Sequence, residues 1–316
     1  MTNPHHTTCK RKRRPLSELN LMDDFLFQEM LSQEDVNEEF CRILLGTILG
    51  KPIRKVRIIP QKNILGIDTD RHGIRMDAYI EDISGDNAPP EMDMIDAEVV
   101  PDIYDMEPNK VYEKKTLPKR MRYYHGLIDT QLLASDVDYD RLPKVVIIII
   151  LPYDPFGKNR MVYTIRNQCM EDTSIPYDDG AEKIFLYTKG TEGNPSQELR
   201  DMLRYIEKSI PENITSQNIE TIHRLVEKVR CKKEVGINYM KSWEHDKMMR
   251  EEGREEGFEL GRNEGLEIGR NEGILALIRS CQKLNATRET AVELLAQNFN
   301  LNQSDSEAYL EKYWQE

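Results

Sequence analysis

The sequence lacks the long apolar runs and the paired cysteines that define several large classes of protein. No apolar segment approaches the roughly 20 residues that a membrane-spanning helix needs, and no apolar stretch follows the N-terminal charges as a secretory signal would require. The five cysteines, at 9, 41, 169, 231 and 281, show no Cys-x-x-Cys spacing. This argues against both a disulfide framework and a zinc site. We therefore expect a soluble, cytoplasmic protein with reduced thiols.

Several familiar catalytic signatures are also missing. The segment 46–51 (GTILGK) resembles a phosphate-binding loop, but only three residues separate its glycines and Pro52 stands where a Ser or Thr would hold magnesium. No Gly-x-Ser-x-Gly segment supports a serine hydrolase, and the six histidines show no metal-ligand spacing.

Charge is unevenly distributed along the 316 residues. The net charge is -12, and residues 244–273 hold ten acidic against five basic side chains, whereas residues 10–14 (KRKRR) are all basic. A strongly acidic protein does not usually coat nucleic acid with positive surface. The basic arm is nevertheless either a solvated tail or a segment that contacts phosphates. The overall charge does not decide whether DNA is a partner.

The hydrophobic pattern predicts an α/β domain followed by a helical extension. After a disordered arm at 1–15, we expect a domain at 16–210 and a helical region at 211–316. Helical spacing appears near 17–49 and 113–134, and a fully apolar run at 145–151 predicts a strand buried on both faces. The other predicted strands lie at 54–60, 73–80, 94–100, 161–166 and 183–188. This order favours a mixed sheet flanked by helices.

The extension contains three octads at 253–276, GREEGFEL, GRNEGLEI and GRNEGILA, with glycine at every fourth residue. Each glycine costs a helix roughly 0.5–1 kcal/mol relative to alanine, so a lone helix here would be marginal. Either the segment packs against another helix and mediates self-association, or it is a frayed linker. Two short helices follow at 287–298 and 304–314, and Ser304 with Glu307 predicts a capping box for the second.

Carboxylates on neighbouring predicted strands form the most informative constellation. Asp77 lies inside one predicted strand, and Asp96 and Glu98 share a face of the strand at 94–100. If these strands are adjacent, Asp77 and Glu98 can reach one divalent cation, and magnesium takes one or two carboxylates while keeping waters. The alternative is that both carboxylates face solvent or pair with Arg75 and Arg122.

At these residues the chain resembles the Rpn recombination-promoting nucleases, also called PD-(D/E)XK nuclease family transposases. The resemblance covers about residues 17–210, and the matching segments are 21–27 (LMDDFLF), 66–70 (GIDTD), 72–77 (HGIRMD), 96–98 (DAE), 117–124 (LPKRMRYY), 154–157 (DPFG), 179–180, 183–186 and 189–190. It implies a restriction-endonuclease-like core that hydrolyses DNA phosphodiesters with Mg²⁺, for which Mn²⁺ is a possible substitute.

The resemblance also assigns roles to individual residues. Asp77 matches the first metal-binding aspartate and Glu98 the second carboxylate, with Asp96 as a possible further ligand. The position two residues later is Lys in the wider superfamily and usually Gln in this family, but here it is Val100. Arg120 and Tyr124 match recurrent family positions, or else form a packing contact between helix and sheet. A migrated lysine is a further option, with Lys114, Lys115 and Lys119 as candidates.

Valine cannot donate a hydrogen bond or stabilise developing charge, so the sequence leaves two main functions open. One is a metal-dependent DNA endonuclease, possibly impaired, of the kind associated with mobile elements and DNA recombination. The other is a degenerate nuclease fold that acts as a DNA-binding or assembly protein. A scaffold built through the C-terminal helices is a third option. As partners we expect DNA and further copies of the chain, in a homo-oligomer formed through the C-terminal helices.

Overall fold

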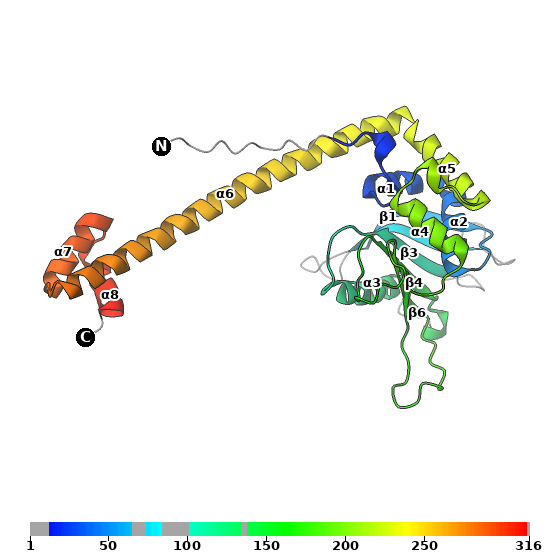
Figure 1. The fold of residues 1–316 in the computed structure, drawn as a ribbon. Coiled ribbons are helices and arrows are strands. Elements are labelled where there is room, and N and C mark those ends of the chain that lie inside the picture. The colour runs from blue at the N-terminus through cyan, green and yellow to red at the C-terminus, as the bar shows by residue number, and fades with distance from the viewer. Residues whose placement is uncertain (1–12, 65–73, 84–100, 134–137, 315–316) are drawn as a thin grey trace. The chain divides into compact units, whose positions relative to one another are not determined.

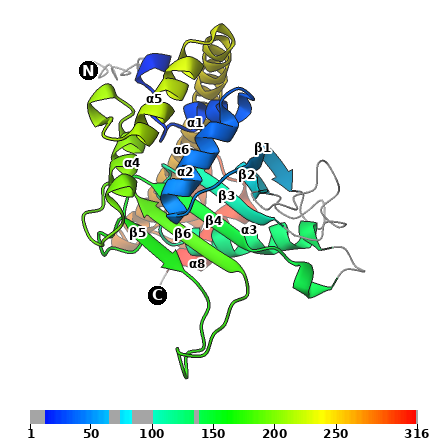
Figure 2. The same ribbon diagram turned by 90° about the vertical axis from the view of Figure 1, so that its right-hand side faces the viewer.

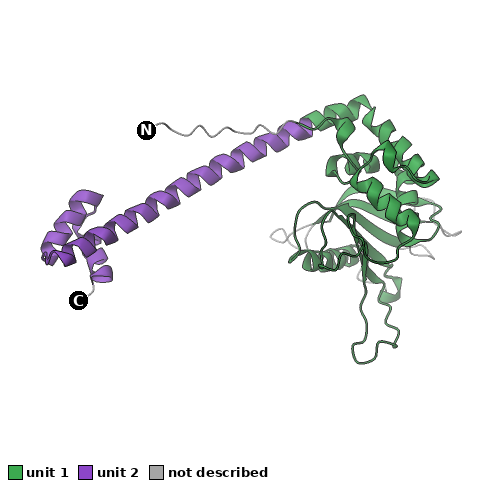
Figure 3. Ribbon diagram, in the orientation of Figure 1, with its two compact units in different colours: residues 1–240 green, residues 241–316 purple. Residues whose placement is uncertain are grey.

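The computed structural model describes residues 13–64, 74–83, 101–133 and 138–314. It divides into two compact units, residues 1–240 and 241–316 (Figure 3). The first unit extends beyond residue 210, where the sequence predicted a domain boundary, because α5 (Gln217–Arg230) buries Ile219, Ile222 and Val226 in the same core as the sheet. Among the described residues, no helix is both long and apolar enough to cross a bilayer.

A six-stranded mixed sheet forms the centre of the first unit, in the order β1-β2-β3-β4-β6-β5 (Figure 1). The first three strands are antiparallel, β3, β4 and β6 are parallel, and β5 runs antiparallel to β6. The strands are β1 (Val56–Ile64), β2 (Ile74–Asp82), β3 (Asp102–Pro108), β4 (Val145–Leu151), β5 (Val162–Ile165) and β6 (Ala181–Tyr187). The predicted α/β class with a mixed sheet is confirmed.

Helices cover both faces of this sheet (Figure 2). The larger core lies between the sheet and α1 (Asp24–Ser32), α2 (Asn37–Leu49), α4 (Gln197–Glu207) and α5. The smaller core lies beneath α3 (Leu117–Leu132). In β4 all seven residues are buried, with Val146, Ile148 and Ile150 in the larger core and alternate residues in the smaller one. This period-2 division is what a strand covered on both faces requires.

A strand that the sequence did not predict, β3, pairs with β2. Residues 94–100 lie outside the described part of the chain, and the strand that pairs with β2 is β3. β2 is paired with β1 on its other edge. The carboxylates that β2 meets on its neighbour therefore come from residues 102–108. Both the 94–100 and the 102–108 segments alternate polar and apolar residues, so periodicity alone did not separate them.

The second unit contains most of α6 (Lys233–Lys283), with α7 (Arg288–Phe299) and α8 (Gln303–Tyr313) packed on its end. The octads at 253–276 are helical throughout. The predicted capping box at Ser304 is wrong. Asn302 caps α8 instead, and its side-chain oxygen accepts a hydrogen bond from the Asp305 amide at 2.8 Å. Both residues favour the N-cap position, and only the path of the chain selects between them.

The turn after β6 contains a glycine that tests how closely the backbone packs in the first unit. A Cβ added at Gly190 would lie 2.8 Å from the backbone nitrogen of Met161, so Gly190→Ala should destabilise the protein by about 1–3 kcal/mol. Gly126→Ala, inside α3 with no atom within 4 Å of the new Cβ, is the matched control and should stabilise by about 0.5–1 kcal/mol. Urea unfolding of both variants measures the difference, and equal stabilities would contradict the close approach.

Candidate functional site

Three carboxylates gather where β2 and β3 run side by side. Tyr79 lies opposite Asp105 in the antiparallel register, and continuing that register by two residues sets Asp77 opposite Glu107. Asp105 has no exposed surface and Glu107 is 7% exposed. We call Asp77, Asp105 and Glu107 the acidic cluster. Charged groups are almost never buried without a partner, so this concentration of like charge marks the site.

Burial and mutual repulsion raise the pKa values of the carboxyl groups in the acidic cluster. Burial is the main cause that raises the pKa of Asp105 well above its usual range, and the charges of Glu107 and Asp77 add to it. Burial likewise raises the pKa of Glu107 to about 7, against the opposing charge of Arg120. The pKa of Asp77 is raised by burial in spite of a hydrogen bond from Gln28. Carboxyl groups whose pKa values are raised in this way are typical of functional sites.

Arg120 on α3 is the cation of the site. Its guanidinium pairs with Glu107 at 3.0 Å and with Glu113 at 2.8 Å. It also lies over the ring of Tyr124, one turn further along the helix, 5.6 Å from the ring centroid. The structure thus brings together the predicted pair Arg120 and Tyr124, and burial raises the pKa of the Tyr124 hydroxyl. The ion pair with Glu107 could not be read from the sequence, because it depends on how α3 packs on the sheet.

Buried polar atoms without hydrogen-bond partners concentrate at the same place. Seven such side-chain atoms occur among the described residues, and five belong to this site. They are Tyr79 Oη, Asp105 Oδ1 and Oδ2, Asn109 Nδ2 and Arg120 Nε. Each unpaired buried polar atom costs about 1–3 kcal/mol, and native proteins contain few of them. Five in one site indicate groups placed for a ligand, since packing alone does not favour them.

Asp77 accepts a hydrogen bond from one glutamine, which in turn accepts a hydrogen bond from a second. Gln28 of α1 donates its side-chain amide to Asp77 Oδ1 at 3.1 Å, and Gln61 of β1 donates to Gln28 Oε1 at 2.8 Å. Gln61 has a positive φ of 52° and lies opposite Asp77, between the paired positions on either side. This chain of amides fixes the orientation of a carboxylate that would otherwise be free to rotate.

The other predicted site residues are distributed as follows. Glu98, Asp96 and Val100 lie outside the described residues. Lys114, Lys115 and Lys119 are all exposed, and it is Arg120 that reaches the acidic cluster.

Sequence reasoning missed Asp105 and Glu107, although a signal existed. The segment 103–109 (IYDMEPN) also alternates apolar and acidic residues. Asn109 follows Glu107 by two residues and is buried, with Oδ1 accepting a hydrogen bond from the Val111 amide at 2.8 Å. A second alternating segment just beyond the first should have been weighed as the partner strand.

The carboxylates of the acidic cluster are the chemical type of ligand that binds a hard divalent cation. Carboxylate oxygens are the ligands that Mg²⁺ prefers, and two of them suffice when waters complete the shell. The described residues contain no group of three His, Cys, Asp or Glu side chains close enough to hold a metal ion. Asp77 and Glu107, which the continued register of β2 and β3 sets opposite each other, are the two candidates.

Comparisons with known proteins give no family. A search with protein-family models found no match, and neither did searches of curated proteins and of solved structures. The residues of the site therefore supply the evidence for function.

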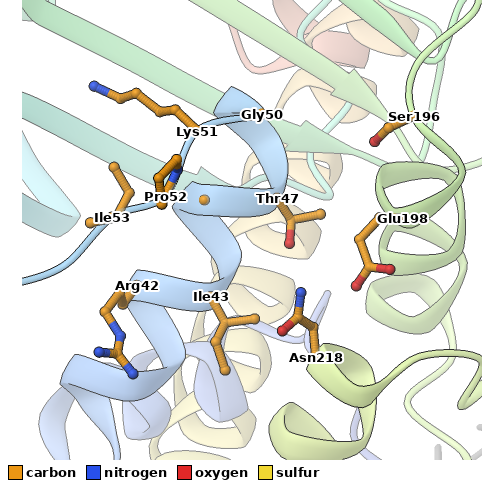
Figure 4. Close-up of a pocket in the computed structure, with 11 residues that line it drawn as sticks. Arg42, Ile43, Thr47, Gly50, Lys51, Pro52, Ile53, Ser196, Glu198 and Asn218 are labelled. Carbon is orange, nitrogen blue, oxygen red and sulfur yellow. The ribbon is translucent and has the colours of Figure 1, made fainter.

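A separate pocket of about 360 Å³ contains the glycines of the loop-like segment 46–51 (Figure 4). This segment ends α2, with Gly50 in the left-handed region at φ 65°. A phosphate-binding loop instead precedes a helix, whose N-terminal amides and positive dipole end attract the anion. Across the pocket, the Glu198 carboxylate accepts a hydrogen bond from the Ser216 hydroxyl at 2.7 Å. The geometry agrees with the rejection of a phosphate loop on spacing.

Proposed function

We propose that this protein is a metal-dependent DNA endonuclease with a restriction-endonuclease-like core. The observation that carries the proposal is the acidic cluster: the register of β2 and β3, continued two residues beyond Tyr79 and Asp105, sets Asp77 opposite Glu107, and Arg120 pairs with Glu107 at 3.0 Å. The resemblance to the Rpn nucleases supports it. With Glu107 as the second carboxylate in place of Glu98, the position two residues later is Asn109, a carboxamide like the glutamine usual in that family. The valine that suggested impaired chemistry then lies outside the motif.

In this proposal each residue has a distinct task. Asp77 and Glu107 would hold Mg²⁺, or Mn²⁺ in its place, and a bound ion polarises a phosphate and lowers the pKa of water. Gln28 and Gln61 orient Asp77, and Arg120 orients Glu107 through their ion pair. Asn109 keeps a buried amide nitrogen free to donate. The raised pKa of Glu107 makes metal binding depend on pH, since the ligand must lose its proton.

One observation favours the second candidate, a non-catalytic DNA-binding or assembly protein. The ion pair of Arg120 with Glu107 neutralises a carboxylate without any metal. If that contact is the whole purpose of the arrangement, the fold is a degenerate nuclease. Under either candidate we propose a cytoplasmic setting, DNA as a partner and self-association through the C-terminal helices.

Nicking of supercoiled plasmid by the purified protein tests the first candidate. We expect cleavage with Mg²⁺, none with EDTA, and a loss of at least about a hundredfold in Asp77→Asn, because several kcal/mol of charge stabilisation depends on the ion. Circular dichroism should show that the variant remains folded. Equal cutting by wild type and Asp77→Asn would reveal a contaminating nuclease and contradict the proposal. DNA binding without cleavage would favour the second candidate.

A further inference from the structure

The octad region of α6 presents four rows of residues, each row made of positions four apart. Such rows form the ridges of a helix surface. One row contains only glycine, which we call the glycine row: Gly253, Gly257, Gly261, Gly265 and Gly269. On one side lies a cationic row: Arg250, Arg254, Phe258, Arg262, Leu266 and Arg270. On the other lies an anionic row: Glu252, Glu256, Leu260, Glu264, Ile268 and Glu272.

The fourth row faces away from the glycines and is entirely polar: Glu251, Glu255, Glu259, Asn263, Glu267 and Asn271. The helix is therefore amphipathic, but with a seam of glycine rather than of large apolar residues. Every apolar residue from 251 to 272 lies in the two rows that flank this seam. A segment exposed on all sides would have no reason for this arrangement.

No described residue of the chain covers the seam over its first five glycines. A Cβ added at any of the five glycines from Gly253 to Gly269 would meet no atom within 4 Å. The apolar side chains that flank it are exposed, from 71% for Phe258 to 59% for Ile268. The next glycine in the row, Gly273, is covered, because the Phe299 ring of α7 lies 3.0 Å from its added Cβ. The chain thus closes one end of the seam by itself and leaves the rest uncovered.

The charges in the middle of the seam form no ion pairs with other described residues, whereas Arg250 and Arg270 at its ends donate hydrogen bonds to the backbone carbonyls of Asp246 and Phe299. The ion pair that the structure forms within 244–273 joins Lys247 to Glu251, ahead of the octads. Arg254 and Arg262 form no ion pair with any residue that the structure describes. One flank offers cations and apolar groups, and the other offers anions and apolar groups. Such a surface complements a copy of itself.

We propose that α6 pairs in parallel with α6 of a second copy of this chain, glycine row against glycine row. A two-fold axis along a parallel pair sets the cationic row of each helix beside the anionic row of the other. Arg254 then lies near Glu256 of the second copy and Arg262 near Glu264, while Phe258 and Leu266 meet Leu260 and Ile268. An antiparallel pair would set like rows together, arginine against arginine, which is unfavourable.

The glycines explain how closely the two helices approach. A row of residues four apart winds around a straight helix because its period exceeds 3.6, so two such rows stay in contact only if the helices coil around each other with a right hand. Glycines four apart permit right-handed crossings in which the backbones touch. The close contact between the two helices offsets the free energy that each glycine costs an isolated helix. The proposal deepens the expected self-association and is independent of nuclease activity, so its failure would leave the proposed function untouched.

Size measurements of the full-length protein test the pairing. We expect a dimer by light scattering at micromolar concentration, and a dissociation constant at least about tenfold higher in Gly257→Leu/Gly261→Leu, because the added side chains hold the helices apart. Leucine has a higher helix propensity than glycine, so circular dichroism should show no loss of helix. Asn263→Leu, on the polar row, is the matched control and should remain dimeric. A monomeric wild type, or a dimer that tolerates the glycine substitutions, would overturn the proposal.

Orientation is tested by cross-linking and charge reversal. In a parallel pair, Gly257→Cys and Gly265→Cys should each form disulfide-linked dimers alone, with wild type measuring the background from native cysteines. Cross-links found only between the two variants in a mixture would indicate an antiparallel pair and overturn the proposal. The variants Arg254→Glu/Arg262→Glu and Glu256→Arg/Glu264→Arg should be monomers separately and a dimer when mixed. Failure of the mixture to associate would contradict the assigned rows.

Discussion

Glu107→Gln should abolish magnesium-dependent plasmid cleavage, whereas Glu98→Gln should leave it close to wild type. Glutamine keeps the shape of the side chain but removes the negative charge that a hard divalent cation requires. The register of β2 and β3, continued by two residues, sets Glu107 opposite Asp77, while the resemblance to the Rpn nucleases had assigned this role to Glu98. We expect a loss of at least about a hundredfold for Glu107→Gln, since each 1.4 kcal/mol changes a rate tenfold.

Thermal unfolding with and without Mg²⁺ provides an independent measurement. A ligand that binds only the folded protein stabilises it by about 2.7 kcal/mol at a hundred times its dissociation constant. Wild type and Glu98→Gln should show this rise in Tm, and Glu107→Gln should not. If Glu98→Gln instead loses both cleavage and the Mg²⁺ effect while Glu107→Gln retains them, the assignment of the second carboxylate is wrong.

Arg120→Met should destabilise the protein by about 3 kcal/mol at pH 8 and by much less at pH 5. Removing one partner of a buried ion pair leaves an uncompensated charge, at a typical cost of about 3–5 kcal/mol, which partial exposure of Arg120 lowers. The pKa of Glu107 is raised to about 7 in the folded protein. Its protonation therefore favours the folded state fully below the unfolded pKa of about 4.3, and this contribution is lost as the pH rises through 7.

Methionine removes the cation that keeps this pKa from rising further, so the destabilisation should grow between pH 5 and pH 8. Urea unfolding at several pH values measures it. Arg122→Met is the matched control, because Arg122 is exposed on the same helix and such substitutions usually change stability by less than about 0.5 kcal/mol. A loss of stability that does not vary with pH would show that Arg120 contributes by packing and not by charge.

Local patterns in the sequence were sufficient to predict the helices and strands that bury a continuous face. The run at 145–151 is apolar at every position, which only a strand covered on both sides accommodates, and β4 occupies those residues. Helical spacing predicted α3 within a few residues, and with it Arg120 and Tyr124 on one side of a helix. The four rows of α6 can also be read from the sequence, because residues four apart on a helix are neighbours wherever the helix lies.

Tertiary structure decided which carboxylates meet. Strand pairing joins residues distant in sequence, and two alternating segments, 94–100 and 102–108, were equally good partners for β2 by periodicity. The register that sets β3 beside β2 supplies Asp105 and Glu107, and the packing of α3 on the sheet brings Arg120 to Glu107. The sequence by itself determined that a carboxylate site with Asp77 was possible. Only the fold selected its other members, because long-range contacts depend on the whole sheet and not on local preference.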